Sequence, residues 1–288
     1  MAVCNVCFRH CHIEEGELGF CGARTCRDGE VVCANYGRLT ALALDPIEKK
    51  PLARFCPGSM ILSVGSYGCN LRCPFCQNSD ISWSDTAFSM AKGTGVHTMS
   101  PEELAAIADS CRKDGNIGVA FTYNEPLIGW EYVRDTAKLI HGLGMKNVLV
   151  TNGTAELTVL EELLPYIDAM NVDFKGFGEE YYRRTLGGSR QQVMDFIERA
   201  ARDCHVEITT LIVPGENESE EEMHEISGWI AQIKDGGGSV IGREIPLHIS
   251  RFFPRFHMTD REATDVRWVY HLADIARGNL THVLTGNC

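Results

Sequence analysis

The chain has 288 residues, of which 39 are acidic and 27 are basic, giving a formal net charge of −12. This length allows two domains, or one α/β barrel with an appendage. The acidic balance argues against a surface that binds nucleic acid, which needs clustered Lys and Arg. No apolar run of about 18 residues is present, so we expect no membrane span. The first residues have neither a basic nor an apolar signal region, so we expect a cytoplasmic protein.

The cysteines are concentrated at the front of the chain: ten of the 13 lie at or before Cys76. Because reducing cytosol disfavours disulfides, a Cys-rich cytosolic chain more often binds metal. Four cysteines follow the spacing C-x2-C-x3-C-x9-C, which suits a thiolate metal site: Cys4, Cys7, Cys11 and Cys21. We expect a structural metal such as zinc here, because a closed four-ligand site suits a segment with little other core. An auxiliary iron–sulfur cluster is the alternative. Cys26 and Cys33 lack ligand spacing and are expected to be ordinary thiols, with replacement of Cys11 by either one as the alternative.

From residue 60 onward, apolar segments typical of strands alternate with amphipathic stretches typical of helices. Capping boxes at Ser100–Glu103 and Thr259–Glu262 mark two of the helix starts. Strict alternation implies parallel strands with right-handed crossovers. The predicted strands are 60–66, 117–123, 146–152, 169–175, 205–213, 246–250 and, more weakly, 281–285.

Six or seven such units favour a partial (β/α)6 TIM-like barrel, with a doubly wound open sheet as the alternative. The sequence therefore predicts an α/β protein with a barrel over residues 59–288. A Cys-rich N-terminal segment over residues 1–58 would form a small metal-binding appendage, since so few residues rarely bury enough surface unaided.

One motif carries the chemistry. Directly after the first predicted barrel strand, three cysteines stand at C-x3-C-x2-C: Cys69, Cys73 and Cys76. Thiolates are soft ligands that suit iron–sulfur clusters or zinc. Three cysteines leave one iron of a cubane cluster without a protein ligand, and an open iron is a place for substrate. A zinc site completed by a distant His, or cysteines of the core, are the alternatives.

Polar residues follow the predicted strands at the ends where barrel enzymes place functional groups. They are Asn124, Glu125, Asn152, Asp173, Lys175 and, within a later strand, His248. Asp173 and Lys175 are two residues apart, so both side chains lie on the same face of a strand. Each residue also has an ordinary explanation. Asn152-Gly153 is a good turn, Asp173 and Lys175 form a salt bridge, and a His in a strand is often structural.

The spacing C-x3-C-x2-C, with the aromatic Phe75 before the last cysteine, resembles the signature of the radical S-adenosylmethionine (radical SAM) superfamily. That resemblance implies a partial (β/α)6 barrel and a [4Fe–4S] cluster whose open iron is chelated by SAM. One electron then cleaves SAM to methionine and a 5′-deoxyadenosyl radical. The superfamily often has Gly-Gly-Glu after the second strand, so Glu125 carries over better than Asn124. The resemblance implies cofactor binding by Phe75, Asn124, Glu125, Asn152 and Asp173, and catalytic roles for Lys175 and His248.

A closer resemblance, over nearly the whole chain, is to the radical SAM component of the AmmeMemoRadiSam group, relatives of pyruvate formate-lyase activating enzyme. Residues 19–24, 45–52, 68–78, 123–126 and 246–252 carry it. It implies hydrogen abstraction from a protein, peptide or small molecule, and a one-electron donor such as flavodoxin or ferredoxin. It does not give the substrate. An exposed cluster with an open iron is sensitive to oxygen, so we expect an anaerobic setting.

Two functions of other classes remain open from the residues alone. A non-catalytic iron–sulfur protein for electron transfer or redox sensing would need no SAM. A zinc-containing nucleic-acid binder is disfavoured by the charge of −12, although residues 251–256 form one basic-aromatic run. That run would more simply line the barrel rim or dock an acidic electron donor. Lys49 and Lys50 are expected on a solvated face, or above the barrel mouth facing an anionic substrate.

Overall fold

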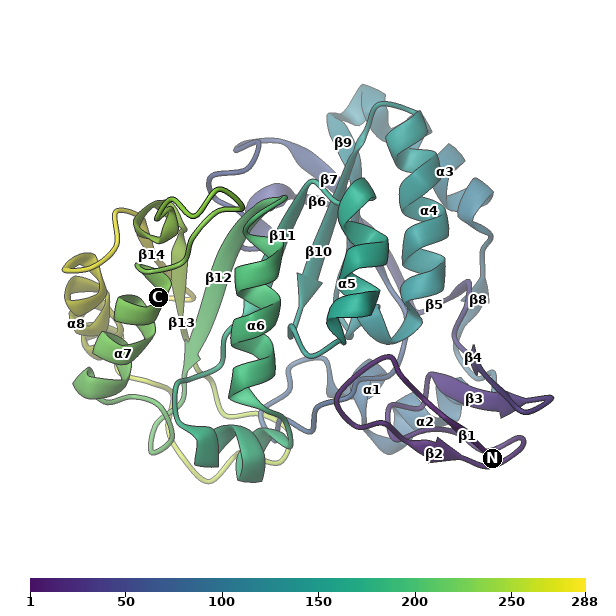
Figure 1. The fold of residues 1–288 in the computed structure, drawn as a ribbon, viewed down its shortest axis with the longest axis horizontal. Coiled ribbons are helices and arrows are strands. Elements are labelled where there is room, and N and C mark those ends of the chain that lie inside the picture. Colours follow the sequence, from purple (N-terminus) through teal and green to yellow (C-terminus); the bar gives the residue numbers. More distant parts are fainter.

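The computed structural model describes all 288 residues and is built around an eight-stranded sheet. Its order is β14-β13-β12-β11-β10-β9-β7-β6 (Figure 1). Seven of these strands run parallel and confirm the seven predicted strands: β7 (Met60–Gly65), β9 (Asn116–Phe121), β10 (Lys146–Thr151), β11 (Ala169–Asp173), β12 (His205–Ile212), β13 (Leu247–Arg251) and β14 (Val283–Gly286). Because β14 and β6 lie at opposite edges and do not pair, the sheet is an incomplete barrel.

The eighth strand was not predicted. β6 (Ala41–Pro46) pairs antiparallel with β7 along its whole length, from Ala41 opposite Gly65 to Pro46 opposite Met60. The predicted boundary between residues 58 and 59 therefore falls between two paired strands. Residues 2–33 of the front segment form two small hairpins, β1 (Ala2–Val3) with β2 (His12–Ile13) and β3 (Arg24–Arg27) with β4 (Glu30–Cys33). Both lie beyond the carboxyl ends of the parallel strands (Figure 1).

Six helices cover the outer face of the sheet (Figure 1). They are α3 (Pro101–Ser110), α4 (Trp130–Gly142), α5 (Leu157–Leu163), α6 (Arg190–Ala200), α7 (Glu220–Ile230) and α8 (Val266–Arg277). The capping box at Ser100 is confirmed, with both of its hydrogen bonds present. The helix start predicted at Thr259 is wrong. Asp265 caps α8 instead, because its carboxylate accepts the N–H of Arg267.

The remaining elements are short. Helices α1 (Ser79–Ser82) and α2 (Asp85–Ala91) follow β7, and β5 (Arg38–Leu39) pairs with β8 (His97–Thr98). Single turns of 3-10 helix are η1 (Ile47–Lys49), η2 (Cys111–Asp114), η3 (Pro126–Gly129), η4 (Leu164–Tyr166) and η6 (Gly242–Glu244), and η5 (Tyr181–Leu186) is π-helical. No helix is long and apolar enough to cross a membrane.

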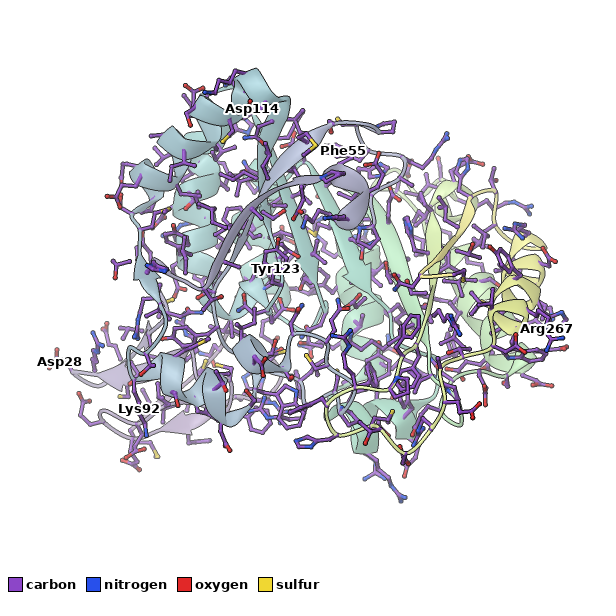
Figure 2. The ribbon with its side chains drawn as sticks, turned by 180° about the vertical axis from the view of Figure 1, so that it is seen from behind. Asp28, Phe55, Lys92, Asp114, Tyr123 and Arg267 are labelled. Atoms are coloured by element: carbon purple, nitrogen blue, oxygen red, sulfur yellow. The ribbon has the colours of Figure 1, made fainter.

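Residues 47–59, which connect β6 to β7, cover the amino ends of the strands on the inner side of the barrel. The amide of Asn171 donates to the carbonyl of Pro51 at 2.8 Å, and Glu207 accepts the N–H groups of Ala53 and Arg54. Phe55, in the same connection, lies at this end of the molecule in Figure 2. These bonds close the barrel at one end, so access to its interior is from the carboxyl end.

Lys50 is not on a solvated face, contrary to the sequence-based expectation. Its side chain is buried and its Nζ lies 2.9 Å from Asp45, which also accepts the hydroxyl of Tyr123 at 2.8 Å. A buried ammonium needs a partner charge, and Asp45 supplies it. Tyr123 lies over the middle of the sheet in Figure 2. Lys49 stays exposed and reaches the same carboxylate at 3.3 Å.

Candidate active site

The loop after β7, residues 66–78, carries the C-x3-C-x2-C motif and is called the cysteine loop below. Gly68 has a φ of 92°, and a Cβ at this position would lie 2.5 Å from the carbonyl oxygen of Cys21. Only glycine fits this left-handed, crowded position. Asn124 fixes the loop from the neighbouring strand end, because it accepts the N–H of Ser66 at 2.9 Å and donates to the carbonyl of Gly68 at 3.1 Å.

The three thiols of the cysteine loop are held in a sheltered place. Cys73 is buried, Cys69 and Cys76 are partly buried, and none forms a disulfide. Burial raises the pKa of Cys69 well above its usual value and that of Cys73 to about 11, and the neighbouring thiols add to both shifts. No three Cys, His, Asp or Glu side chains converge closely enough to hold a single ion. The three thiols of this loop are soft donors, and such donors suit the iron of an iron–sulfur cluster.

Phe75 lies within the loop but faces away from solvent. Its ring is buried and meets Phe252 edge to face at 6.3 Å. The N–H of His257 donates to the carbonyl of Pro74 at 2.8 Å, and Phe256 packs edge to face on Trp83 at 4.7 Å. The basic-aromatic run after β13 therefore packs against the cysteine loop, at the barrel rim.

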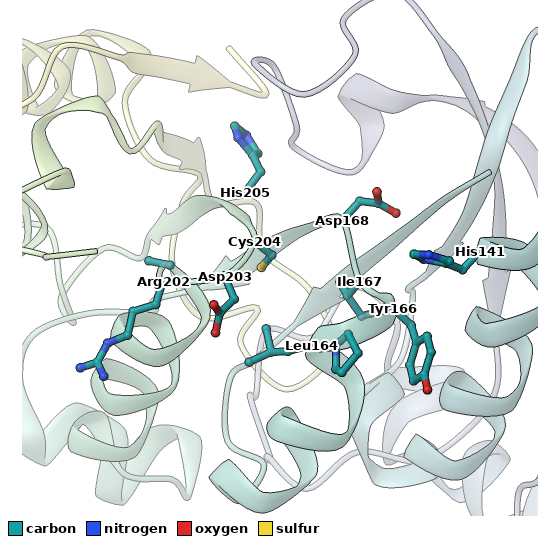
Figure 3. Close-up of a pocket in the computed structure, with 11 residues that line it drawn as sticks. His141, Leu164, Tyr166, Ile167, Asp168, Arg202, Asp203, Cys204 and His205 are labelled. Carbon is teal, nitrogen blue, oxygen red and sulfur yellow. The ribbon is translucent and has the colours of Figure 1, made fainter. Parts of the chain in front are cut away.

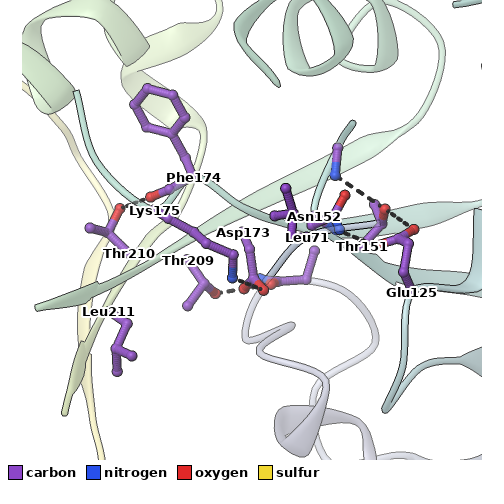
Figure 4. Close-up of polar contacts among 12 residues, drawn as sticks. Leu71, Glu125, Thr151, Asn152, Asp173, Phe174, Lys175, Thr209, Thr210 and Leu211 are labelled. Carbon is purple, nitrogen blue, oxygen red and sulfur yellow. Dashed lines mark hydrogen bonds and ion pairs between the residues drawn. The ribbon is translucent and has the colours of Figure 1, made fainter. Parts of the chain in front are cut away.

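Glu125 follows β9 and is buried among hydrogen-bond donors (Figure 4). Its Oε1 accepts the hydroxyl of Thr151 at 2.7 Å and the N–H of Leu127 at 3.1 Å, and its Oε2 accepts the N–H of Asn152 at 2.8 Å. Burial raises its pKa to about 7 and outweighs these bonds, which lower it. Since each oxygen has two lone pairs, only Oε2 keeps one free to accept a further donor.

Asn152 joins the end of β10 to the cysteine loop. Its Nδ2 donates to the Sγ of Cys69 at 3.7 Å and to the Oδ1 of Asn70 at 2.9 Å. Its Oδ1 accepts the hydroxyl of Thr154 at 2.6 Å, which itself accepts the amide of Asn70 at 2.8 Å. This closed ring of side chains fixes which way each amide points.

Asp173 and Lys175 form the ion pair that their spacing suggests, with Nζ 2.9 Å from the carboxylate (Figure 4). Burial lowers the pKa of Lys175, but the charges of Asp173 and Cys73 outweigh it and hold that pKa well above its ordinary value. The backbone N–H of Lys175 donates to the hydroxyl of Tyr182 at 2.9 Å, and its carbonyl accepts the amide of Asn217 at 2.7 Å. A permanently charged ammonium thus stands beside Cys73.

His248 lies on β13, opposite Thr209 of β12, and it bonds Glu207 instead of a residue of the cysteine loop. Its Nε2 lies 2.6 Å from the carboxylate of Glu207, which is fully buried and also bonds His205 at 3.0 Å. Burial opposes ionisation of Glu207, but the bonds from both imidazoles and two backbone N–H groups lower its pKa to about 2. The structure therefore brings His248 into a His–Glu–His array inside the barrel.

The four cysteines predicted as a second metal site lie together around one cavity. Cys4, Cys7, Cys11 and Cys21 all line it, at the two N-terminal hairpins. This N-terminal cavity also receives Asn70 from the cysteine loop.

Several residues of the site had no sequence signal strong enough to single them out. Asn70 lies inside the motif, yet only the fold shows that its amide reaches Thr154. Arg9 donates to the carbonyl of Asn70 at 2.7 Å, and Arg72 donates to the carbonyl of Cys69 at 2.8 Å. Thr151 lies at the end of a predicted strand, but its bond to Glu125 depends on the pairing of β9 with β10.

Another pocket lies away from these residues. It has a volume of about 460 Å³ and is formed by the connections that precede β11 and β12, so it opens at the amino ends of the strands (Figure 3). His141, Asp168 and His205 are among its lining residues, and none of the predicted site residues is. Parallel α/β sheets bind their ligands at the carboxyl ends of the strands, whereas this pocket lies at the amino ends. The candidate active site is therefore the cysteine loop and not this pocket.

Comparison with known proteins decides the family. Residues 63–227, which include the whole motif and the ends of β9, β10 and β11, match the radical SAM superfamily. The chain belongs to the radical SAM superfamily. It is therefore an enzyme of the radical SAM type, and members of this superfamily bind SAM and a [4Fe–4S] cluster.

Individual relatives agree. An uncharacterized protein of Methanocaldococcus jannaschii is 36% identical over 99% of this chain and 80% of its own length. Pyruvate formate-lyase 1-activating enzyme of Escherichia coli is 27% identical over 55% of this chain and 63% of that enzyme. The crystal structure of Streptococcus suis SuiB bound to S-adenosylmethionine shares the fold, with a TM-score of 0.57 at 14% identity, over 77% of this chain and 48% of that one. The relation to pyruvate formate-lyase activating enzyme is thus confirmed, and the AmmeMemoRadiSam group stays a prediction.

Proposed function

We propose that Cys69, Cys73 and Cys76 bind a [4Fe–4S] cluster with which this enzyme cleaves SAM reductively. When bound, the cluster supplies the electron that divides SAM into methionine and a 5′-deoxyadenosyl radical, and that radical abstracts hydrogen from the substrate. The proposal rests on the positions of these residues relative to one another. The loop with three sheltered thiols lies against Asn152, Glu125 and the Asp173–Lys175 pair, at the carboxyl ends of successive strands.

Each neighbouring residue has a role that its contacts support. Glu125 has one free lone pair on Oε2, which would accept one N–H of the SAM ammonium. Lys175 uses one ammonium proton on Asp173 and has two more to donate to the SAM carboxylate. Asn152 orients Cys69, and Asn124 holds the loop backbone. Phe75 packs the loop against Phe252. His248 is not one of these neighbours, because it bonds Glu207, which also holds the amino-end connection, and there it would exchange a proton.

We propose a polypeptide substrate in preference to a small molecule. The E. coli relative activates pyruvate formate-lyase, and SuiB has been crystallised with its precursor peptide SuiA. A one-electron donor of the flavodoxin or ferredoxin class would dock at the basic-aromatic run, because Arg251 stacks on exposed Phe253 at 4.8 Å and the run contacts the cysteine loop. Such acidic donors complement arginine by charge.

The test is anaerobic. The protein is reconstituted with iron and sulfide, reduced with dithionite and given SAM, and 5′-deoxyadenosine is quantified. We expect its formation in the wild type and in Cys204→Ala, whose thiol lies at the opposite end of the barrel, and none in Cys73→Ala. A bound cluster without SAM cleavage would contradict the proposal and favour a redox protein.

A further inference from the structure

The N-terminal cavity gathers four thiols that the proposed SAM chemistry does not use. Cys4, Cys7 and Cys21 are buried, Cys11 is partly buried, and none forms a disulfide. Apart from the thiols, two arginines and Asn70, the lining is glycine and aliphatic residues: Val6, Ile13, Gly19 and Ile128. Four free thiols that share a largely apolar cavity are the donor set of a metal–thiolate centre.

Two turns bring these thiols to one cavity, although their sulfurs do not yet converge on a single point. The N–H of Cys4 donates to the carbonyl of Cys11 at 2.9 Å and extends the β1–β2 pairing, so these two cysteines lie across a hairpin. Cys7 lies in its tip, where its carbonyl accepts the N–H of His10 at 3.2 Å. The second turn, closed by the bond from Gly22 N–H to the carbonyl of Gly19 at 2.9 Å, presents Cys21. The barrel fixes the tip of the first hairpin, because Cys7 forms a β-bridge with Ala155 and the carbonyl of Val6 accepts the N–H of Glu156 at 2.9 Å.

The charge around the cavity suits an anionic centre. Four thiolates around a dipositive metal ion or cluster leave a net charge of about −2. Arg9 and Arg24 both line the cavity, and Arg24 is only 4% exposed, paired with Glu131 at 2.6 Å. Glu131 already balances the charge of Arg24, whereas Arg9 donates to the backbone carbonyls of Asn70 and Gly187, so an anionic centre would balance the charge of Arg9.

The cavity adjoins the cysteine loop. A Cβ on Gly68, the residue before Cys69, would lie 2.5 Å from the carbonyl oxygen of Cys21, so the two backbones are in contact. Asn70, the residue after Cys69, lines the cavity and is bonded to Asn152, which also bonds the Sγ of Cys69. A purely structural ion gains nothing from this position, but a redox centre gains a short path to the loop.

We propose that Cys4, Cys7, Cys11 and Cys21 bind a second [4Fe–4S] cluster, closed by four thiolates, which delivers electrons to the cysteine loop. In the step, the N-terminal cluster loses one electron and the loop cluster gains it, with no bond made or broken. A one-electron donor of the ferredoxin or flavodoxin class reduces the N-terminal cluster again, and this route is faster than direct reduction of the loop cluster by a donor at the basic-aromatic run. Electron transfer to the loop cluster rests on the proposed function, whereas binding of the N-terminal cluster does not.

The first experiment removes the loop cluster. The Cys69→Ala/Cys73→Ala/Cys76→Ala variant is reconstituted anaerobically, and iron, sulfide and zinc are measured, followed by electron paramagnetic resonance after reduction. We expect about four iron and four sulfide per chain and a reduced-cluster signal that SAM does not change. Bound zinc in place of iron, or no metal, would overturn the proposal. Because this variant cannot cleave SAM, the result is independent of the proposed function.

The second experiment removes the N-terminal thiols from an otherwise intact chain. We expect Cys4→Ala/Cys21→Ala to lower the iron content from about eight to about four per chain. This double variant should still cleave SAM when dithionite is the reductant. When reduced flavodoxin is the reductant, it should cleave SAM at least tenfold more slowly than the wild type. Cys33→Ala is the matched control, because Cys33 lies in the same segment but bonds Asn35 and does not line the cavity. Unchanged iron in the double variant, or iron lost equally in the control, would contradict the assignment.

Discussion

The side-chain amide of Asn152 lies 3.7 Å from the Sγ of Cys69 and donates a hydrogen bond to it. Its orientation is fixed, because its other bonds are to Asn70 and to both the N–H and the hydroxyl of Thr154. The end of β10 thereby sets the position of the first thiol in the cysteine loop. Hydrogen bonds to cluster sulfur stabilise the more negative, reduced state and so raise the reduction potential.

Asn152→Ala should therefore lower the reduction potential of the loop cluster. A bond worth about 1 kcal/mol corresponds to a shift on the order of 40 mV for a one-electron couple. The shift is measured by redox titration followed by electron paramagnetic resonance in a chain that lacks Cys4 and Cys21. Thr210→Val is the control, because its hydroxyl bonds the carbonyl of Phe174 away from the thiols. An equal shift in both variants would count against the proposed bond.

Glu125 should make stability depend on pH. Burial raises its pKa to about 7, from an ordinary value of 4.5, so between these values the folded chain keeps a proton that the unfolded chain has lost. The stabilisation from this group is complete below the unfolded pKa and is lost as pH rises through the folded one, by about 1.4 kcal/mol per pH unit.

Across this window we expect the free energy of unfolding of the cluster-free wild type to fall by about 3 kcal/mol more than that of Glu125→Gln. Urea unfolding at several pH values measures the two slopes. Glu162→Gln, at an exposed position, should follow the wild type. Parallel slopes for wild type and Glu125→Gln would show that burial does not hold the proton.

The Asp173–Lys175 pair should show coupling in a double-mutant cycle. Lys175 is 15% exposed and Asp173 is 35% exposed, so solvent partly screens their attraction. Asp173→Asn leaves a sheltered ammonium without its partner, and we expect a loss of about 1–2 kcal/mol of unfolding free energy. Lys175→Met in the same chain should recover part of that loss, measured by urea denaturation. Strictly additive effects would argue that the pair is not an interacting unit.

Glu207→Gln should be among the more damaging polar substitutions. The carboxylate accepts from two backbone N–H groups and bonds His205 and His248 with no exposure to solvent, so we expect a loss of about 3 kcal/mol. Because its pKa is lowered to about 2, its stabilisation is present above the unfolded value near 4.5 and is lost as pH falls toward 2.

Glu220→Gln gives a matched comparison for that measurement. Glu220 also pairs with a histidine, His271 at 2.7 Å, but on the surface, where such a pair contributes little. Thermal unfolding midpoints at pH 7 should separate the two variants clearly. Similar midpoints would mean that the buried array does not stabilise the barrel.

The sequence by itself determined the parts that depend on local pattern. Alternating apolar and amphipathic segments located all seven parallel strands, and the capping box at Ser100 located the start of α3, because both signals lie within a few residues. The spacing of Cys69, Cys73 and Cys76, with Phe75 between them, indicated the superfamily that the comparisons confirm.

Only the tertiary structure decided which distant residues meet. β6 joins the sheet by backbone pairing, which has little sequence signature on an edge strand, and Lys50 is buried because Asp45 and Tyr123 surround it. The bonds of Asn152 to Cys69 and of His248 to Glu207 join residues 83 and 41 positions apart. The contact of Gly68 with Cys21 is also long-range, and it places the N-terminal cavity beside the cysteine loop. Such neighbours are set by strand order and loop packing, which the pattern along one chain does not encode.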